Sequence, residues 1–237
     1  QTFLLEIYRG SMTKKQSSGS DIRPFRIEIP QADLDDLQER LARTRLPIPA
    51  PGDDWDYGTP NAYLRETVDY WRDEFDWRAV EERINAFPQY LTDIDGQTVH
   101  FIHVPSAEKG ATPLLLLHTY PGSVIDFLEM IGPLTDPVAH GGKAEDAFSV
   151  VVPSLPGLGF STPLVERGWT TARAAKTYDA LMRRLGYASY GTHGSDNGAM
   201  ISRELGLLNP KGFLGLHVLQ LFSFPSGDPT EFEKLSP

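Results

Sequence analysis

The stretch of sequence that decides the fold is YGTHGSDNGAM, at residues 190–200. Its pattern predicts the end of a strand, a very tight turn and the start of a helix. Small residues stand at Gly194, Gly198 and Ala199, around one acidic side chain, Asp196. A sharp strand-to-helix turn strains the backbone of its central residue, and larger neighbours would collide with it. The glycines therefore indicate that Asp196 lies at the tip of such a turn.

This layout matches a nucleophile elbow in which Asp196 takes the place of the usual serine. An aspartate in an ordinary glycine-rich turn explains the stretch equally well on its own, because Gly-x-Asp-x-Gly is a short pattern. The choice between the two interpretations depends on the elements that precede the turn.

Length, composition and charge narrow the class of protein. The 237 residues suffice for one large domain, or for a domain with an accessory segment. A formal net charge of −10 disfavours partners such as nucleic acid or anionic membranes. The chain has no Cys, so disulfides and thiolate metal sites are excluded, and a cytoplasmic location is expected. No apolar run is long enough for a membrane span.

The first 88 residues differ from the rest of the chain. Residues 1–20 are expected to be a tag-like or disordered leader, because Gly10-Ser11-Met12 is typical of a tag junction. Residues 21–88 predict a helical segment, with an extended strap at 23–30 and helices at 31–45, 61–76 and 77–85. This segment has too little core to fold alone, so we expect it to wrap the following domain. Its dense aromatic side chains are expected to pack there rather than bind a ligand.

From residue 89 to 237, strands and helices alternate. Strands are predicted at 89–94, 97–104, 113–118, 148–152, 187–192 and 213–219, and helices at 124–134, 171–185 and 197–208. Such alternation predicts an α/β fold with a doubly wound, mostly parallel sheet. Ligands of such sheets bind beyond the carboxyl ends of the strands, where His118, Pro153 and Asp196 are expected.

Two loops before the elbow strengthen its interpretation. The sequence HTYPGS at 118–123 follows one buried strand, and PSLPGLGFS at 153–161 follows the next. In α/β-hydrolases the first of these loops supplies one backbone N–H to an oxyanion hole, and the residue after the nucleophile supplies another. The two loops and the turn at Asp196 occur in the order expected of this fold. Together they favour the elbow over an ordinary turn far more than any one of the three motifs does alone.

With these motifs, the sequence resembles the microsomal type of epoxide hydrolase, including the N-terminal segment that marks that group. The resemblance extends over about residues 21–225 and implies an α/β-hydrolase core at 89–237 behind a wrapping segment at 21–88. The stretches that carry it are Pro24–Ile27, Arg43–Pro47, Trp55–Gly58, Tyr70-Trp71, Phe75–Arg78, Phe87–Tyr90, Ile94–Gly96, His100–His103, Pro121–Ser123, Pro153–Ser161 and Gly194–Ala199.

The resemblance also implies a mechanism. Asp196 would attack a carbon of an apolar organic epoxide and form an alkyl-enzyme ester, which an activated water would hydrolyse to a vicinal diol. The backbone N–H groups of Tyr120 and Asn197 would hold the oxyanion of the second step, and Tyr120 would also contact the substrate. The Tyr120–Pro121 peptide is expected to be cis. No cofactor and no metal are implied, and a homo-oligomer is possible.

Two departures from the family pattern stand out. The residue after the loop histidine is usually glycine and here is Thr119, so the loop must follow a non-glycine path or leave less room. The catalytic base, its acid partner and the lid tyrosines of the family have no matching position in the sequence. We therefore expect a longer protein whose C-terminal remainder completes the site, and an apolar sheet edge at residues 213–219.

None of the six histidines matches the base. His193 is interpreted as a neighbour of the site, and His118 as an anchor of its loop through hydrogen bonds. Structural or surface roles are the default for the other four, His100, His103, His140 and His217.

Three alternatives remain open to different degrees. Another Asp-nucleophile hydrolase, such as a dehalogenase, is disfavoured by the N-terminal segment. A serine esterase that used Ser195 would place His193 and Asn197 where small residues are needed. A truncated, non-catalytic hydrolase-fold domain remains possible, as do roles in detoxification or in secondary metabolism.

Overall fold

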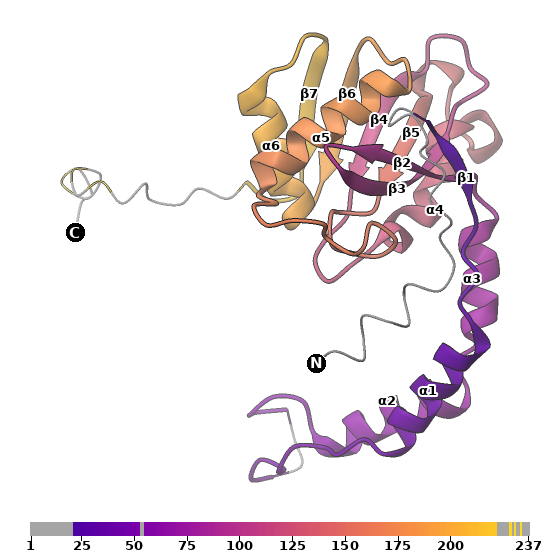
Figure 1. Ribbon diagram of the computed structural model, residues 1–237, viewed down its shortest axis with the longest axis vertical. Helices are drawn as coiled ribbons and strands as arrows, with labels where there is room; N and C mark the ends of the chain where they lie inside the picture. The colour runs from indigo at the N-terminus through magenta and orange to yellow at the C-terminus, as the bar shows by residue number, and fades with distance from the viewer. Residues whose placement is uncertain (1–20, 53–54, 222–227, 229, 231–232, 234–237) are drawn as a thin grey trace. The chain divides into compact units, whose positions relative to one another are not determined.

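The computed structural model describes residues 21–52, 55–221, 228, 230 and 233 (Figure 1). The described chain divides into two compact units, one within residues 26–87 and one that joins residues 21–25 to residues from 88 onward. The leader expected at residues 1–20 lies outside the described residues, and the wrapping role of the N-terminal segment stays a prediction.

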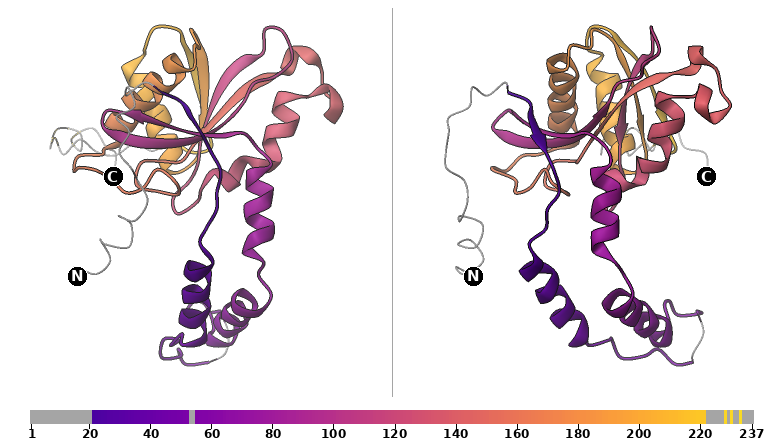
Figure 2. Two further views of the ribbon diagram at one scale, coloured as in Figure 1. Left: turned by 45° about the vertical axis from the view of Figure 1, so that its right-hand side comes forward. Right: turned by 90° about the vertical axis from the view of Figure 1, so that its right-hand side faces the viewer.

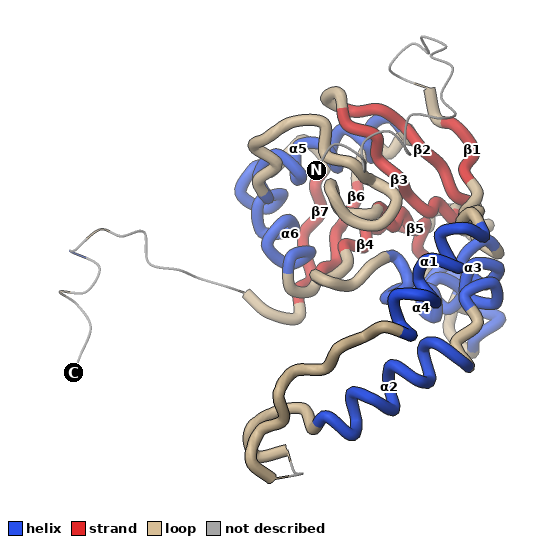
Figure 3. The backbone as a smooth tube through the Cα atoms, turned by 60° about the horizontal axis from the view of Figure 1, so that its bottom comes forward, coloured by secondary structure: helices blue, strands red, loops and turns tan. Residues whose placement is uncertain are grey.

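The larger unit is built on one mixed sheet, with β1 and β7 at its opposite edges (Figure 3). The strand order is β1-β2-β3-β5-β4-β6-β7; β5, β4, β6 and β7 run parallel, and β1, β2 and β3 join them antiparallel. This arrangement confirms the α/β prediction and makes the motif-bearing strands parallel neighbours. The strands are β1 (Arg23–Phe25), β2 (Gln89–Ile94), β3 (Gln97–Val104), β4 (Thr112–Leu117), β5 (Phe148–Pro153), β6 (Tyr190–Gly194) and β7 (Phe213–Val218).

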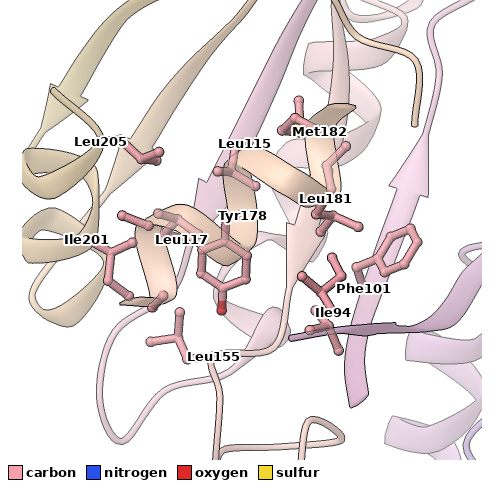
Figure 4. Packing of buried hydrophobic residues seen from close by; sticks show 14 of the residues in the cluster. Ile94, Phe101, Leu115, Leu117, Leu155, Tyr178, Leu181, Met182, Ile201 and Leu205 are labelled. Carbon is pink, nitrogen blue, oxygen red and sulfur yellow. The ribbon is translucent and has the colours of Figure 1, made fainter. Parts of the chain in front are cut away.

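Helices cover both faces of this sheet (Figure 2). Leu115 and Leu117 of β4 pack with α5 (Thr171–Arg184) and α6 (Asn197–Leu208) in the main hydrophobic core (Figure 4). The alternate residues of the same strand point the other way, towards α4 (Leu128–Thr135), because successive strand side chains face opposite sides. Burial on both faces explains the continuous apolar sequence of this strand.

The register of the parallel strands places the motif loops at one edge. Leu117 pairs with Gly194, so the loop after β4 and the turn after β6 begin side by side. Leu115 pairs with Val151, so the loop after β5 leaves the same edge on the other side of β4. The carboxyl ends of β5, β4 and β6 thus carry the three motifs, which is where a doubly wound sheet binds its ligands.

The edge strand β7 has an exposed apolar surface. Among the described residues it pairs with β6 alone. Leu214 and Leu216 are 61% and 40% exposed, and they border an open apolar hollow shared with Leu116 and Met130. The apolar edge expected from the sequence is therefore present.

Local differences from the sequence predictions have local causes. β6 begins at Tyr190 rather than at Tyr187, because Gly186 has a φ of 87° and Tyr187 N–H donates to Met182 O, which closes the end of α5. The helix predicted at 124–134 opens instead as a 3₁₀ turn, η2 (Val124–Phe127), before α4. Two short 3₁₀ helices that the sequence did not predict follow it, η3 (Val138–His140) and η4 (Ala144–Asp146).

The smaller unit contains α1 (Gln31–Ala42), α2 (Asn61–Asp73) and α3 (Trp77–Asn85). An extended stretch at 27–29 runs beside α3, whose side chains bond to its backbone. Asn85 accepts from Ile27 N–H at 2.9 Å and donates to Ile27 O at 2.8 Å, and Glu81 accepts from Ile29 N–H at 2.7 Å. No helix in the described part of the chain is both long and apolar enough to cross a bilayer.

Candidate active site

The turn after β6 has the strained geometry that its sequence predicted. Asp196 has φ 51° and ψ −119°, a conformation that residues with a side chain rarely adopt. A Cβ on Gly194 would lie 2.3 Å from the backbone of Gly198, and a Cβ on Gly198 would lie 2.0 Å from Leu117 O. The two glycines are therefore required because strand and helix backbones touch on either side of Asp196.

The carboxylate of Asp196 meets the loop after β4. Tyr120 N–H donates to Asp196 Oδ1 at 2.9 Å, although the two residues lie 76 positions apart. The Tyr120–Pro121 peptide is cis, as the resemblance implied. Tyr120 is 61% exposed, and Asp196 is half-buried. One oxygen of the carboxylate thus has a backbone donor, and the second oxygen is free of that contact.

His118 anchors this loop, as expected from the sequence. The ring is fully buried; its Nδ1–H donates to Thr119 O at 2.7 Å, and its Nε2 accepts from Leu155 N–H at 3.0 Å. These two bonds assign the proton to Nδ1 and require a neutral ring. Burial lowers the pKa of His118, against the opposing effect of the Thr119 carbonyl. The ring therefore ties the loop after β4 to the loop after β5.

Thr119 fits the loop without a glycine conformation. Among the described residues the non-glycine positions with positive φ are Asp95, Asp196 and Asn209, so Thr119 has an ordinary backbone. Its hydroxyl donates to Asp126 Oδ2 at 2.9 Å, and its N–H approaches the same oxygen at 3.3 Å. The sequence did not single out Asp126, and the one available signal was its place at the start of a predicted helix.

The loop after β5 is fixed by a buried polar network. His100 Nδ1 lies 2.8 Å from Ser154 Oγ, and its Nε2 lies 3.0 Å from Gln89 Oε1. Ser161 Oγ donates to Ser154 O at 2.8 Å and accepts from His100 N–H at 3.0 Å. Burial, with a smaller effect of the nearby His118, lowers the pKa of His100 to about 3, so this ring is neutral. His100 has the structural role expected of it.

The structure pairs two histidines that the sequence did not connect. His193 Nδ1 lies 2.8 Å from His217 Nδ1, and the rings stack with centroids 4.9 Å apart. Burial, together with the neighbouring His217, lowers the pKa of His193. The pair lies on β6 and β7 and lines the apolar hollow, so His193 is a neighbour of the elbow.

The remaining site predictions have mixed support. Asn197 is the first residue of α6, so its N–H belongs to the unpaired start of a helix, but its part in an oxyanion hole stays a prediction. Ser195 Oγ donates to Gln220 Oε1 at 3.2 Å and does not bond to a histidine in the described contacts. No cluster of three or more His, Cys, Asp or Glu side chains in the described ranges could hold a metal ion.

Comparison with known proteins agrees with this geometry. Residues 22–127 match the family model of the epoxide hydrolase N terminus, and residues 112–235 match that of the alpha/beta hydrolase fold. The chain therefore belongs to the α/β-hydrolase fold family. Within that family it is a relative of the epoxide hydrolases, which confirms the resemblance identified from the motifs.

The individual relatives include two proteins known from their sequences. A protein of Stigmatella aurantiaca (strain DW4/3-1), whose name assigns it provisionally to the epoxide hydrolases, is 48% identical over 209 residues, which are 88% of this chain and 48% of that protein. Epoxide hydrolase 1 of Oryctolagus cuniculus is 39% identical over 201 residues, 83% of this chain and 44% of that protein. The chain thus spans about half the length of these relatives.

Solved structures agree with this relationship. The juvenile hormone epoxide hydrolase of the silkworm Bombyx mori has a TM-score of 0.74 at 35% identity, covering 84% of this chain and 52% of that one. Aspergillus niger epoxide hydrolase has a TM-score of 0.76 at 31% identity, covering 91% and 56%.

Proposed function

We propose that this chain belongs to an epoxide hydrolase that opens an apolar organic epoxide to a vicinal diol through a covalent ester on Asp196. One carboxylate oxygen attacks an epoxide carbon, the carbon–oxygen bond of the ring breaks, and an acid supplies a proton to the released oxygen. Water then adds to the ester carbonyl, and the diol leaves with the oxygen that had attacked. The proposal assigns neither that acid nor the base that activates water to a residue of this chain.

The hydrogen bond from Tyr120 N–H to Asp196 Oδ1 is the observation that supports this proposal most strongly. It leaves Oδ2 as the nucleophile, and Oδ1 becomes the carbonyl oxygen of the ester. In the second step Oδ1 carries the negative charge, already next to a backbone donor at 2.9 Å. A second donor, Asn197 N–H, is proposed to complete the oxyanion hole from the start of α6. Tyr120 is proposed to contact the substrate with its exposed ring.

Isotope transfer tests the covalent route. The full product of the gene, in excess over styrene oxide in heavy-oxygen water, should acquire one heavy oxygen in the peptide that contains Asp196. The diol from this first turnover should contain none, because its new oxygen comes from the carboxylate. Asp196→Asn should form no ester at the start of the experiment, and Ser195→Ala should behave like the unchanged protein. Heavy oxygen in the first-turnover diol would reject the ester, and equal activity of Ser195→Ala would reject a serine nucleophile.

We also propose a cytoplasmic location and a homo-oligomer. The location rests on the sequence, since a chain without Cys fits a reducing compartment. Size-exclusion chromatography with light scattering would measure the oligomeric state.

A further inference from the structure

The Asp126 carboxylate binds Thr119, the residue before Tyr120, whose N–H is the proposed oxyanion donor. Its Oδ2 accepts from Thr119 Oγ1 at 2.9 Å and is 3.3 Å from Thr119 N. Asp126 lies in η2, which is held in place because Val124 and Phe127 on either side of it are 2% and 5% exposed. An exposed carboxylate on a fixed turn therefore holds Thr119 by both its backbone and its side chain.

Gly122 packs directly against the Thr119–Asp126 contact. A Cβ at this position would lie 2.1 Å from Thr119 Oγ1 and 2.4 Å from Asp126 Oδ2. The space that a side chain would need is occupied by the Thr119–Asp126 contact. The loop therefore closes on itself between residues 119 and 126, with glycine at the point of closest approach.

The peptide between Thr119 and Tyr120 connects the Thr119–Asp126 contact to Asp196, because its N–H bonds to the Asp196 carboxylate. The peptide is trans and planar, so its C=O and N–H point in opposite directions. His118 Nδ1–H holds the C=O at 2.7 Å, and the N–H on the other side donates to Asp196 Oδ1. With Thr119 N and Oγ1 held by Asp126, this peptide has little freedom to rotate.

We infer that Thr119 and Asp126 act as a positioning pair, which holds the Tyr120 N–H where the oxyanion forms. This inference rests on the proposed function. Neither residue touches the reacting atoms. A donor must lie within a few tenths of an ångström of its ideal distance to the oxyanion, and an error of about 1 Å can cost a hundredfold in rate. The oxyanion forms only when the ester is hydrolysed, so release of the pair slows that step more than ester formation.

Three variants separate positioning from general stability. Thr119→Val removes the hydroxyl at constant size, Thr119→Ser keeps it, and Asp126→Ala removes the acceptor. Asp136→Ala is the matched control, because Asp136 is likewise an exposed aspartate whose carboxylate accepts from a backbone N–H, that of Ala139, at 3.2 Å. Rapid-quench mass spectrometry with styrene oxide measures formation and hydrolysis of the Asp196 ester separately in the full gene product.

Asp126→Ala is expected to slow ester hydrolysis about ten- to a hundredfold, so that ester accumulates, with little change in ester formation. Thr119→Val should show a smaller effect in the same direction, and Thr119→Ser and Asp136→Ala should match the unchanged protein. Unchanged hydrolysis, or equal slowing of both steps, would overturn the inference.

Exchange of the Tyr120 amide with water, measured by NMR, gives a readout that needs no activity. It should accelerate in Thr119→Val and Asp126→Ala, while the amide of Leu117 in β4 stays protected and shows an intact fold. If the unchanged protein forms no ester, the proposed function fails and this exchange alone decides the positioning role. Equal Tyr120 exchange in all variants would then reject it.

Discussion

Gly198 is the residue that most directly permits the elbow. A Cβ at this position would lie 2.0 Å from Leu117 O and 2.6 Å from Leu117 C. Both are backbone atoms, which cannot rotate away as the end of a side chain can. Gly198→Ala should therefore push α6 from β4 and destabilise the fold by about 3 kcal/mol. Urea unfolding followed by tryptophan fluorescence measures the loss.

Gly206→Ala in the same helix provides the control for this prediction. Its Cβ would meet Leu216 Cδ2 at 2.8 Å, which is the end of a flexible side chain. Alanine is also the better helix former by about 1 kcal/mol, so this variant should lose little or no stability. Equal losses in the two variants would contradict the steric explanation of the elbow.

The sequence could predict the elbow because its cause is local. Small residues within four positions of Asp196 indicate a tight turn where backbones meet, and the two loops that precede it then favour the elbow over an ordinary turn. The partners of Thr119 and His193 were not predictable in the same way. Asp126 reaches Thr119 from a 3₁₀ turn where an α-helix was predicted, and His217 lies beside His193 through the register of β6 and β7.

At the scale of elements, α3 acts as the partner of an extended segment. Asn85 supplies both a donor and an acceptor to Ile27, as a neighbouring strand would. Burial opposes the ionisation of Glu81, but hydrogen bonds from Ile29 N–H and Arg78 keep its pKa below the usual value. Periodicity predicted the helix and the strap separately. It could not show that polar side chains of one would replace the sheet partner of the other.

This arrangement makes Asn85→Ala a test of the strap. The substitution leaves the buried Ile27 N–H and C=O without their partners, which costs about 1–3 kcal/mol each. The strap should then open more often, and trypsin should cut faster after the exposed Arg26. The exposed Glu82→Ala on the same helix should leave the rate of cleavage unchanged. No acceleration in Asn85→Ala would show that the strap is held by other contacts.

At the scale of the whole molecule, parallel strands gather motifs that lie far apart in the sequence. The order of the three loops identified the family because each loop follows a parallel strand of one sheet. The same sheet edge also contains buried histidines near the site. Their neutral rings hold the loops together. His118 and His100 bind the loops after β4 and β5 through ring nitrogens that act as acceptors.

These histidines should make the stability of the larger unit depend on pH. Burial lowers the pKa of His100 to about 3, and it also lowers the pKa values of His103, His118 and His193. In the unfolded chain these four rings take up protons near pH 6.5, and in the folded protein they do so at lower pH. Stability should therefore be full above about pH 7 and fall as the pH drops below 6.5, by about 1.4 kcal/mol per unit for His100 alone.

Urea unfolding between about pH 7 and pH 5 measures this slope, in a range where the carboxylates stay ionised. His100→Gln removes one titrating ring, so its stability should be lower at pH 7 but should decline less steeply as the pH falls. His140→Gln is the control, because it replaces an exposed histidine instead of a buried one. Parallel pH profiles for all three proteins would show that the buried ring of His100 does not govern acid unfolding. A shallower slope for His100→Gln alone would assign part of the acid sensitivity to the network that holds the loop after β5.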